Sequence, residues 1–127
     1  MKTVLTYGTF DLLHYGHINY LKKAKSLGDV LIVGLSSDEF NLEKGKKSFY
    51  DFETRKEMLS AIKYVDKIFR QDSFEQKADD IKKYKADILV SSEDWKGKYD
   101  YLKDLCEVIY LDRTPGISTT QIKKLIN

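Results

Sequence analysis

The chain of 127 residues is long enough for one domain built around one hydrophobic core. Its 42% apolar and 33% charged residues are typical of a globular protein and exclude disordered and collagen-like classes. The 22 basic and 20 acidic residues are mixed along the chain and give a net charge of +2, so charge alone provides no general attraction to nucleic acid or to an anionic membrane.

Strands and helices are predicted to alternate through the first half of the chain. The apolar run Lys2–Tyr7 predicts a buried strand, and His17–Leu27 predicts a helix because its apolar residues recur at helical spacing before a glycine. The segment Asp29–Ser36 is almost entirely apolar, which is typical of a strand covered on both faces. After a basic loop, Asp51 is placed to cap a helix whose apolar positions reach Val65.

Three more short strands are predicted in the second half. Ser73 and Gln76 have the spacing of a capping box, which predicts a helix between the first two of these strands. Residues 94–105 predict a loop with a short helix before the last strand. The three strands are KIF at residues 67–69, DILVS at 87–91 and EVIYL at 107–111.

The last helix is predicted near the C-terminus, after a turn at Pro115. Ser118 and Gln121 form a second capping box there. Strands that alternate with helices predict the α/β class, here a Rossmann-like doubly wound parallel five-stranded sheet with helices on both faces. No repeat or linker interrupts the sequence, so residues 1–127 are expected to form a single domain.

The single cysteine and the lack of long apolar runs lead us to expect a cytoplasmic protein. Cys106 lies in the run CEVIYL, where a thiol packs as a small hydrophobe, and it has no partner for an internal disulfide. The sequence opens with no basic leader and contains no apolar stretch long enough for a bilayer, so membrane insertion is not expected.

The loop after the first strand, GTFDLLHYGH, places histidines and glycines where a parallel sheet binds its ligands. His14 and His17 are three residues apart at a helix start, and Gly16 lets the backbone approach a ligand closely. Free amides at that helix start attract an anion, so the two imidazoles could stabilise charge on a phosphorus under attack. Surface histidines or zinc ligands are the alternatives, although no further histidine exists and Cys106 is isolated.

A second phosphate-binding pattern is predicted near the C-terminus, in RTPGISTT. Hydroxyls and free amides at the start of the last helix can hold phosphate oxygens, and Arg113 adds a guanidinium suited to bidentate contact. An ordinary N-cap would explain STTQ by itself. Two such helix starts at opposite ends of one short chain favour a shared site, so we expect both ends to converge on one triphosphate.

These motifs resemble the nucleotidyltransferase superfamily marked by His-x-Gly-His, here HYGH, with a second signature matching ISTT at residues 117–120. Within it the chain resembles the glycerol-3-phosphate cytidylyltransferase family over essentially its whole length, through TYGTFDLLHYGH, SSDEFN, YVD, DW-G-YDYLKD-CEVIYL and RT-GISTT. The resemblance implies condensation of CTP with sn-glycerol 3-phosphate to CDP-glycerol and pyrophosphate. It also implies Mg²⁺, a homodimer and a role in making teichoic acid or another surface glycerol-phosphate polymer.

The resemblance also implies roles for individual residues. Asp11 would lie near the metal and the phosphates, and Lys44 and Lys77 would bind the incoming glycerol phosphate. From the residues alone, lysines in a polar loop or on the polar face of a helix are usually solvated. The implied catalytic group is His14, His17, Lys46 and Arg113. The implied CTP site adds Thr9, Phe10, Asp11, Gly16, Lys63, Asp94, Trp95, Thr114, Gly116, Ile117, Ser118, Thr119 and Thr120.

Three positions depart from that family and leave alternatives open. Ser92 and Glu93 stand in VSSEDW where the family has a glycine and an aspartate, and Lys63 stands where an arginine is common. Because the motifs address phosphates and not a base, an adenylyltransferase and a cytidylyltransferase for another phosphorylated alcohol are kept as alternatives. A nucleotide-binding module without catalysis is a third alternative, although the loss of a histidine or of Arg113 that would point to it is not seen. A choline-type acceptor would need an aromatic cage for its cation, whereas Lys44 and Lys77 favour a plain anionic phosphate.

Overall fold

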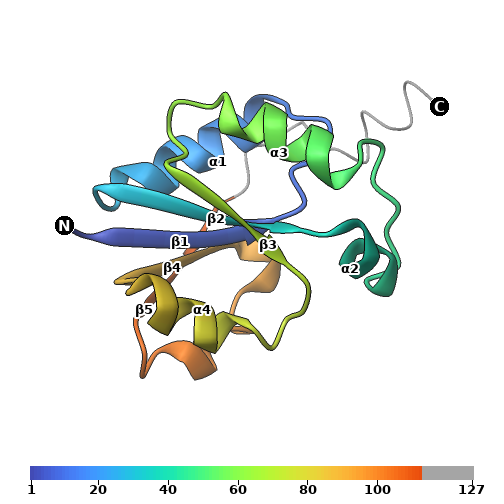
Figure 1. The fold of residues 1–127 in the computed structure, drawn as a ribbon. Coiled ribbons are helices and arrows are strands. Elements are labelled where there is room, and N and C mark those ends of the chain that lie inside the picture. The colour runs from blue at the N-terminus through green and yellow to red at the C-terminus, as the bar shows by residue number, and fades with distance from the viewer. Residues whose placement is uncertain (113–127) are drawn as a thin grey trace.

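The computed structural model describes residues 1–112 and has a five-stranded parallel sheet at its centre (Figure 1). The strand order is β3-β2-β1-β4-β5, so the winding reverses between β1 and β4. This order confirms the predicted Rossmann-like doubly wound sheet. The strands are β1 (Thr3–Gly8), β2 (Val30–Ser36), β3 (Lys67–Gln71), β4 (Ile88–Ser92) and β5 (Glu107–Leu111).

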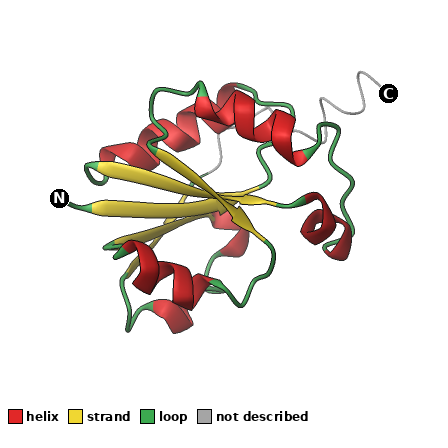
Figure 2. Ribbon diagram, viewed as in Figure 1, coloured by secondary structure: helices red, strands yellow, loops and turns green. Residues whose placement is uncertain are grey.

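Helices cover both faces of the sheet, as predicted (Figure 2). One face carries α1 and α3, the other carries α4 and η2, and α2 lies beyond the carboxyl ends of the strands. Within residues 1–112 no helix combines the length and the apolar character needed to cross a membrane. The helices are α1 (Tyr15–Ser26), α2 (Asp38–Glu43), α3 (Phe52–Ser60), α4 (Lys77–Tyr84) and the 3-10 turns η1 (Glu93–Trp95) and η2 (Asp100–Leu102).

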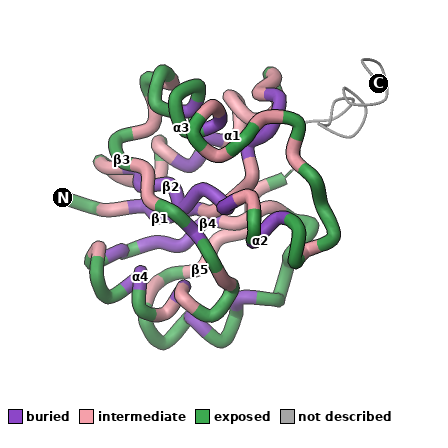
Figure 3. Tube along the Cα trace, turned by 45° about the vertical axis from the view of Figure 1, so that its right-hand side comes forward, coloured by how far each residue is buried: buried purple, intermediate pink, exposed green. Residues whose placement is uncertain are grey.

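The core is split by the sheet, because successive strand side chains point to opposite faces. In β1, Val4 packs in the cluster that contains Leu21 of α1, whereas Leu5 packs in the cluster that contains Ile81 of α4. Figure 3 shows the buried residues concentrated along the central strands. Burial on both faces explains why these strands are continuous apolar runs in the sequence.

Helix boundaries differ from the predictions where a side chain caps the backbone. The helix predicted from His17 begins at Tyr15, because the side chain of His14 is its N-cap. Asp51 caps α3 as predicted, accepting a 2.9 Å hydrogen bond from the backbone N–H of Thr54. That helix ends at Ser60, so the apolar residues up to Val65 pack against the core from a turn instead.

Two further segments correct the predictions. The helix α2 was not predicted; Ser37 caps it by accepting a 3.0 Å hydrogen bond from the N–H of Phe40. The helix α4 begins at Lys77, later than the predicted capping box implies. Only half of that box forms, since the Gln76 side chain accepts from the N–H of Ser73 at 3.1 Å across a turn that precedes the helix.

Gly34 in β2 leaves the space that the ring of Tyr7 occupies. A Cβ at this position would lie 2.5 Å from Tyr7 Cδ1 and 2.8 Å from Phe69 Cζ, which is too close for either ring to stay in place. We expect Gly34→Ala to lower the free energy of unfolding by about 1–3 kcal/mol in urea denaturation. In the double variant with Tyr7→Ala the loss should be smaller than the sum of the single losses; additive losses would contradict the clash.

Candidate active site

A cavity of about 470 Å³ opens at the carboxyl ends of the strands, where a doubly wound sheet binds its ligands. Its lining includes the last residue of four neighbouring strands, so it spans the point where the winding reverses. These four residues are Gly8 of β1, Ser36 of β2, Gln71 of β3 and Ser92 of β4. The cavity is therefore a property of the sheet order, and loops only complete it.

Most of the site residues predicted in the described part of the chain line this one cavity. The residues from the first loop join the lysines of the basic loop and of α4 there, although these segments are far apart in sequence. The predicted residues that line it are Thr9, Phe10, Asp11, His14, Gly16, His17, Lys44, Lys46, Lys77, Asp94 and Trp95.

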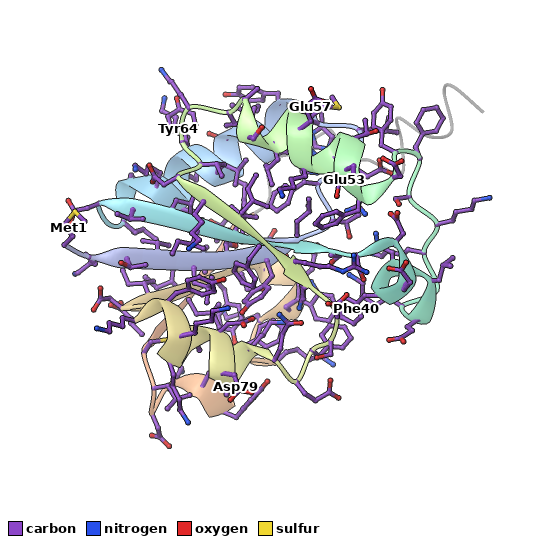
Figure 4. The ribbon with its side chains drawn as sticks, in the orientation of Figure 1. Met1, Phe40, Glu53, Glu57, Tyr64 and Asp79 are labelled. Atoms are coloured by element: carbon purple, nitrogen blue, oxygen red, sulfur yellow. The ribbon has the colours of Figure 1, made fainter. Side chains whose placement is uncertain are left out.

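Lys63 is the exception within residues 1–112. It is exposed in the turn between α3 and β3, with its Nζ 5.3 Å from the ring centroid of Tyr64. Figure 4 labels Tyr64 on the side of Met1, where the strands begin, and Phe40 on the opposite side, where they end. Lys63 therefore does not line the cavity, because α3 ends at Ser60 and the chain turns back before β3 at the opposite end of the strands. Its predicted contact with CTP stays a prediction.

The second predicted phosphate-binding segment lies outside the described residues. Convergence of the two ends of the chain on one triphosphate therefore stays a prediction. The residues concerned are Arg113, Thr114, Gly116, Ile117, Ser118, Thr119 and Thr120.

The two histidines form a reciprocal cap at the start of α1. Nδ1 of His14 accepts a 3.0 Å hydrogen bond from the N–H of Gly16, and Nδ1 of His17 accepts a 3.2 Å bond from the N–H of His14. The two rings stack with their centroids 3.9 Å apart. Each Nδ1 is an acceptor, so in each neutral ring the single proton is on Nε2. The spacing HYGH thus fixes both the position and the tautomer of two donors.

Both imidazoles are neutral at pH 7. Burial lowers the pKa of His14, and burial together with the neighbouring His14 ring lowers the pKa of His17 to about 4. The two rings therefore contribute Nε2–H donors without a full positive charge. The positive end of the α1 dipole adds to the attraction of this position for an anion. This arrangement suits an anionic ligand whose charge grows during a reaction.

The loop between β1 and α1 is held in a strained shape by its neighbours. Phe10 and Leu12 have φ values of 47° and 49°, in the left-handed region that residues with a side chain seldom adopt. The buried carboxylate of Asp11 accepts the backbone N–H groups of Phe49 and Tyr50, the second at 3.0 Å. Asp11 thus ties the histidine loop to the end of the basic loop that carries the lysines.

The expected magnesium site fits this cavity only in part. Within the described residues no group of three or more histidine, cysteine, aspartate or glutamate side chains could hold a metal ion. The two oxygens of Asp11 accept the backbone N–H groups of Phe49 and Tyr50, so the carboxylate is an acceptor group held at the wall of the cavity. Mg²⁺ commonly uses one or two carboxylates together with substrate phosphates and water. The cavity fits an ion of that kind, with Asp11 as the side chain that would hold it.

Arg55 of α3 does not line the cavity but holds together three segments that form its wall. Nothing in the sequence had pointed to Arg55. Its guanidinium is fully buried and joins the first loop, the end of β2 and the segment before α3. Nη1 donates to the carbonyl oxygens of Thr9 at 3.0 Å and Ser36 at 2.8 Å. Nε donates to the carbonyl oxygen of Tyr50 at 3.0 Å, and Nη2 pairs with Asp38 at 2.7 Å.

Lys44 is held at one end of the cavity. Its Nζ donates to Ser36 Oγ at 3.0 Å and lies 4.5 Å from the ring centroid of Phe40. Burial, with the charges of Lys46 and Arg55, lowers the pKa of Lys44 to about 8. The ammonium is therefore desolvated and faces like charges, a position that binding of an anion would stabilise.

Lys77 is buried, not solvated on the polar face of α4. Its side chain is 2% exposed, and Nζ lies 4.5 Å, 4.7 Å and 5.1 Å from the ring centroids of Tyr7, Tyr99 and Phe74. Burial and the charge of Lys44 lower the pKa of Lys77 to about 8. Three aromatic faces thus hold a second ammonium at the cavity, close enough to Lys44 for the two charges to repel each other.

Hydrogen bonds fix the aromatic walls around Lys77. The hydroxyl of Tyr7 donates to Asp80 Oδ2 at 2.7 Å, and Gln76 Nε2 donates to the same oxygen at 3.0 Å. Trp95 extends this group, with its ring centroid 6.1 Å from Phe74 and 6.0 Å from Tyr99. These contacts place Trp95 beside Lys77, in the part of the cavity that also contains Lys44, here called the lysine end. The predicted contact of Trp95 with the base and ribose stays a prediction.

The strand ends held a signal that the sequence analysis did not use. Tyr7 and Ser36 are the last residues of predicted strands, where side chains of neighbouring strands meet. Gln71 was missed because the third strand was predicted to stop at Phe69. Phe74 and Tyr99 carried no such signal, since only the folded chain brings them to Lys77.

A Rossmann-like sheet whose cavity joins a histidine-capped helix start to desolvated lysines defines an α/β protein built to bind phosphate groups, as nucleotidyltransferases do. A family model described as cytidylyltransferase-like matches residues 5–125. The chain belongs to this cytidylyltransferase-like family.

Curated relatives match almost the whole chain. The glycerol-3-phosphate cytidylyltransferase of Staphylococcus aureus (strain NCTC 8325 / PS 47) is 58% identical, over 98% of this chain and 94% of the relative. The protein of the same name from Bacillus subtilis (strain 168) is 56% identical, over 99% and 98%. Among solved structures, the lipopolysaccharide core biosynthesis protein from Thermoplasma volcanium GSS1 superposes with a TM-score of 0.80 at 27% identity, covering 90% of this chain and 98% of that chain.

Proposed function

We propose that this protein is a nucleotidyltransferase that condenses CTP with sn-glycerol 3-phosphate to give CDP-glycerol and pyrophosphate. The single observation that carries the proposal is one cavity with two different ends for anions. Neutral histidine donors lie at the α1 start, and two desolvated ammoniums lie at Lys44 and Lys77. The relatives named glycerol-3-phosphate cytidylyltransferase, which match nearly the whole chain, support the choice of both substrates.

The reaction proceeds by direct in-line transfer, without a covalent enzyme intermediate. A phosphate oxygen of glycerol 3-phosphate attacks the α-phosphorus of CTP, the bond to the β-phosphate oxygen breaks, and pyrophosphate leaves. The acceptor phosphate needs no general base, because it is already an anion at neutral pH. The protein therefore has to align two anions that repel each other and to stabilise charge at the α-phosphate.

Each end of the cavity contributes to one of these tasks. The Nε2–H groups of His14 and His17 donate to the phosphate oxygens that gain charge, and Lys46 holds the nucleotide phosphates. Lys44 and Lys77 bind the acceptor phosphate and offset its repulsion from the triphosphate. Mg²⁺, when bound with the nucleotide near Asp11, supplies further charge neutralisation.

The cage around Lys77 argues against a choline-type acceptor. Tyr7, Phe74 and Tyr99 form the kind of aromatic group that binds a quaternary ammonium, but the Lys77 ammonium already occupies it. A second cation in this position would be repelled by Lys77 and by Lys44. The filled cage favours an acceptor whose recognised group is an anionic phosphate with an uncharged alcohol part.

We further propose that the residues of the RTPGISTT segment, from Arg113 to Thr120, close over the nucleotide, and that the enzyme is a cytoplasmic homodimer. In this proposal it supplies CDP-glycerol for teichoic acid or another surface glycerol-phosphate polymer. Support comes from the likeness of the chain to its relatives along nearly its full length. Light scattering of the purified protein, with and without CTP, measures the oligomeric state.

The decisive experiment is pyrophosphate release from each of the four nucleoside triphosphates with sn-glycerol 3-phosphate and Mg²⁺. We expect release with CTP and at most about 1% of that rate with ATP, since a polar site rejects a wrong base strongly. Release with ATP as the preferred nucleotide would instead support the adenylyltransferase alternative, which Ser92 and Glu93 left open. Thermal stabilisation by CTP without release would support a binding module.

The lysine end predicts how acceptor affinity depends on pH. Lys44 and Lys77 both have a pKa lowered to about 8, so raising the pH through this value removes their charges in the empty cavity. The KM for glycerol 3-phosphate should therefore rise by at least about 10-fold between pH 7.5 and 9. Initial-rate kinetics test this, and Lys44→Gln should flatten the pH slope because one titrating group is lost. A KM that stays constant over this range would contradict the assignment of the two lysines.

A further inference from the structure

Gln71 and Ser36 lie side by side at the lysine end of the cavity. They are paired in register at the last positions of β3 and β2, and their side chains are 2% and 0% exposed. Ser36 Oγ accepts from Lys44 Nζ at 3.0 Å. Gln71 Nε2 donates to the carbonyl oxygen of Ser73, next to the Phe74 wall of the Lys77 cage. Both residues line the cavity, so a ligand held by the two lysines is within reach of this pair.

The carboxamide of Gln71 has hydrogen-bonding capacity left over. It can donate two hydrogens and accept through two lone pairs. Nε2 uses one hydrogen, on Ser73 at 3.1 Å, and Oε1 has only a 3.5 Å contact from Ser36 Oγ, at the long limit of a hydrogen bond. A buried amide with one hydrogen and one oxygen open matches an alcohol group, which both donates and accepts. A phosphate dianion can only accept, and the lysines already serve it.

We propose that Gln71 recognises a hydroxyl group on the alcohol part of the acceptor and so determines which phosphorylated alcohols the enzyme uses. The inference rests on the proposed function and deepens it. With the acceptor phosphate on Lys44 and Lys77, the attached carbon chain lies against the ends of β2 and β3, and Gln71 pairs with its hydroxyl. An acceptor without that hydroxyl leaves the buried Gln71 amide without a hydrogen-bond partner, and this free-energy cost weakens binding of that acceptor.

The test compares two acceptors that differ by one hydroxyl. The kcat/KM is measured with CTP for sn-glycerol 3-phosphate and for 1,3-propanediol monophosphate, which lacks the central hydroxyl, on the full chain. We expect the unchanged enzyme to prefer glycerol 3-phosphate by at least about 10-fold. Gln71→Met, close in shape but without the amide, should reduce this preference to within about 3-fold. The loss should appear in the KM for glycerol 3-phosphate more than in kcat.

Arg70→Met is the control at the neighbouring position of β3, because Arg70 pairs with Glu39 and Asp72 on the exposed surface and does not line the cavity. It should cost little stability and leave the preference between the acceptors intact. If Gln71→Met does not fold, Gln71→Asn makes the same test by withdrawing the amide by one methylene. Equal loss with both acceptors, or no preference in the unchanged enzyme, would overturn the inference. An unchanged enzyme that releases no pyrophosphate from CTP and glycerol 3-phosphate would instead refute the proposed function.

Discussion

Replacing His14 or His17 with alanine is expected to lower the turnover number by about 10²–10⁴-fold. Each ring presents an Nε2–H donor because its Nδ1 is held by a backbone N–H. Such donors contribute most where charge develops in the transition state, so kcat should fall much more than CTP affinity does. Steady-state kinetics and calorimetric CTP binding on each variant separate the two effects.

The cap at the start of α1 allows catalysis and folding to be measured apart. His14→Asn keeps a side chain that caps a helix well, whereas His14→Ala removes the cap and should cost about 1 kcal/mol of stability. Both variants lose the Nε2–H donor, so both should lose turnover to a similar degree. Full turnover in His14→Asn would show that His14 acts only as a cap, and full turnover in both alanine variants would refute the role of the pair.

The strands and the first loop were predictable because their chemistry is local. Continuous apolar runs such as Asp29–Ser36 identify strands covered on both faces, and the alternation of elements leads to the parallel sheet. The rule that ligands bind at the carboxyl ends of such strands then places HYGH at the cavity. By contrast α2 is six residues long, too short for a helical period to stand out in the sequence.

The parts of the site that escaped prediction depend on contacts between distant segments. Lys77 reads as exposed on an amphipathic helix, yet rings from β1, the turn before α4 and the segment after η1 enclose its ammonium. Nothing in the sequence singled out Arg55, yet its side chain is fully buried and donates to three segments. The role of Lys63 in CTP binding was predicted from the resemblance alone. Because α3 ends at Ser60, Lys63 lies in the turn before β3, at the end of the strands opposite the cavity.

Arg55→Met is expected to lower the free energy of unfolding by about 3–5 kcal/mol, because the buried guanidinium is the donor for several groups at once. Without it the carbonyl oxygens of Thr9, Ser36 and Tyr50 lose a partner inside the protein. Arg55→Lys should lose most of the same stability, since one ammonium cannot reproduce the planar fork. Urea unfolding measures both variants.

Arg70→Met is the control that shows whether the stability lost in Arg55→Met comes from the burial of the arginine or only from the loss of its charge. Arg70 pairs with Glu39 and Asp72 at 2.8 Å each, but on an exposed surface, so its loss should cost at most about 1 kcal/mol. Equal small losses at both arginines would show that the network behind the cavity does not stabilise the fold. If the network acts as described, Arg55→Met should also weaken CTP binding in calorimetry. Thr9 and the segment around Tyr50 would no longer be fastened to the end of β2, so the histidine loop and the basic loop would lose their common support.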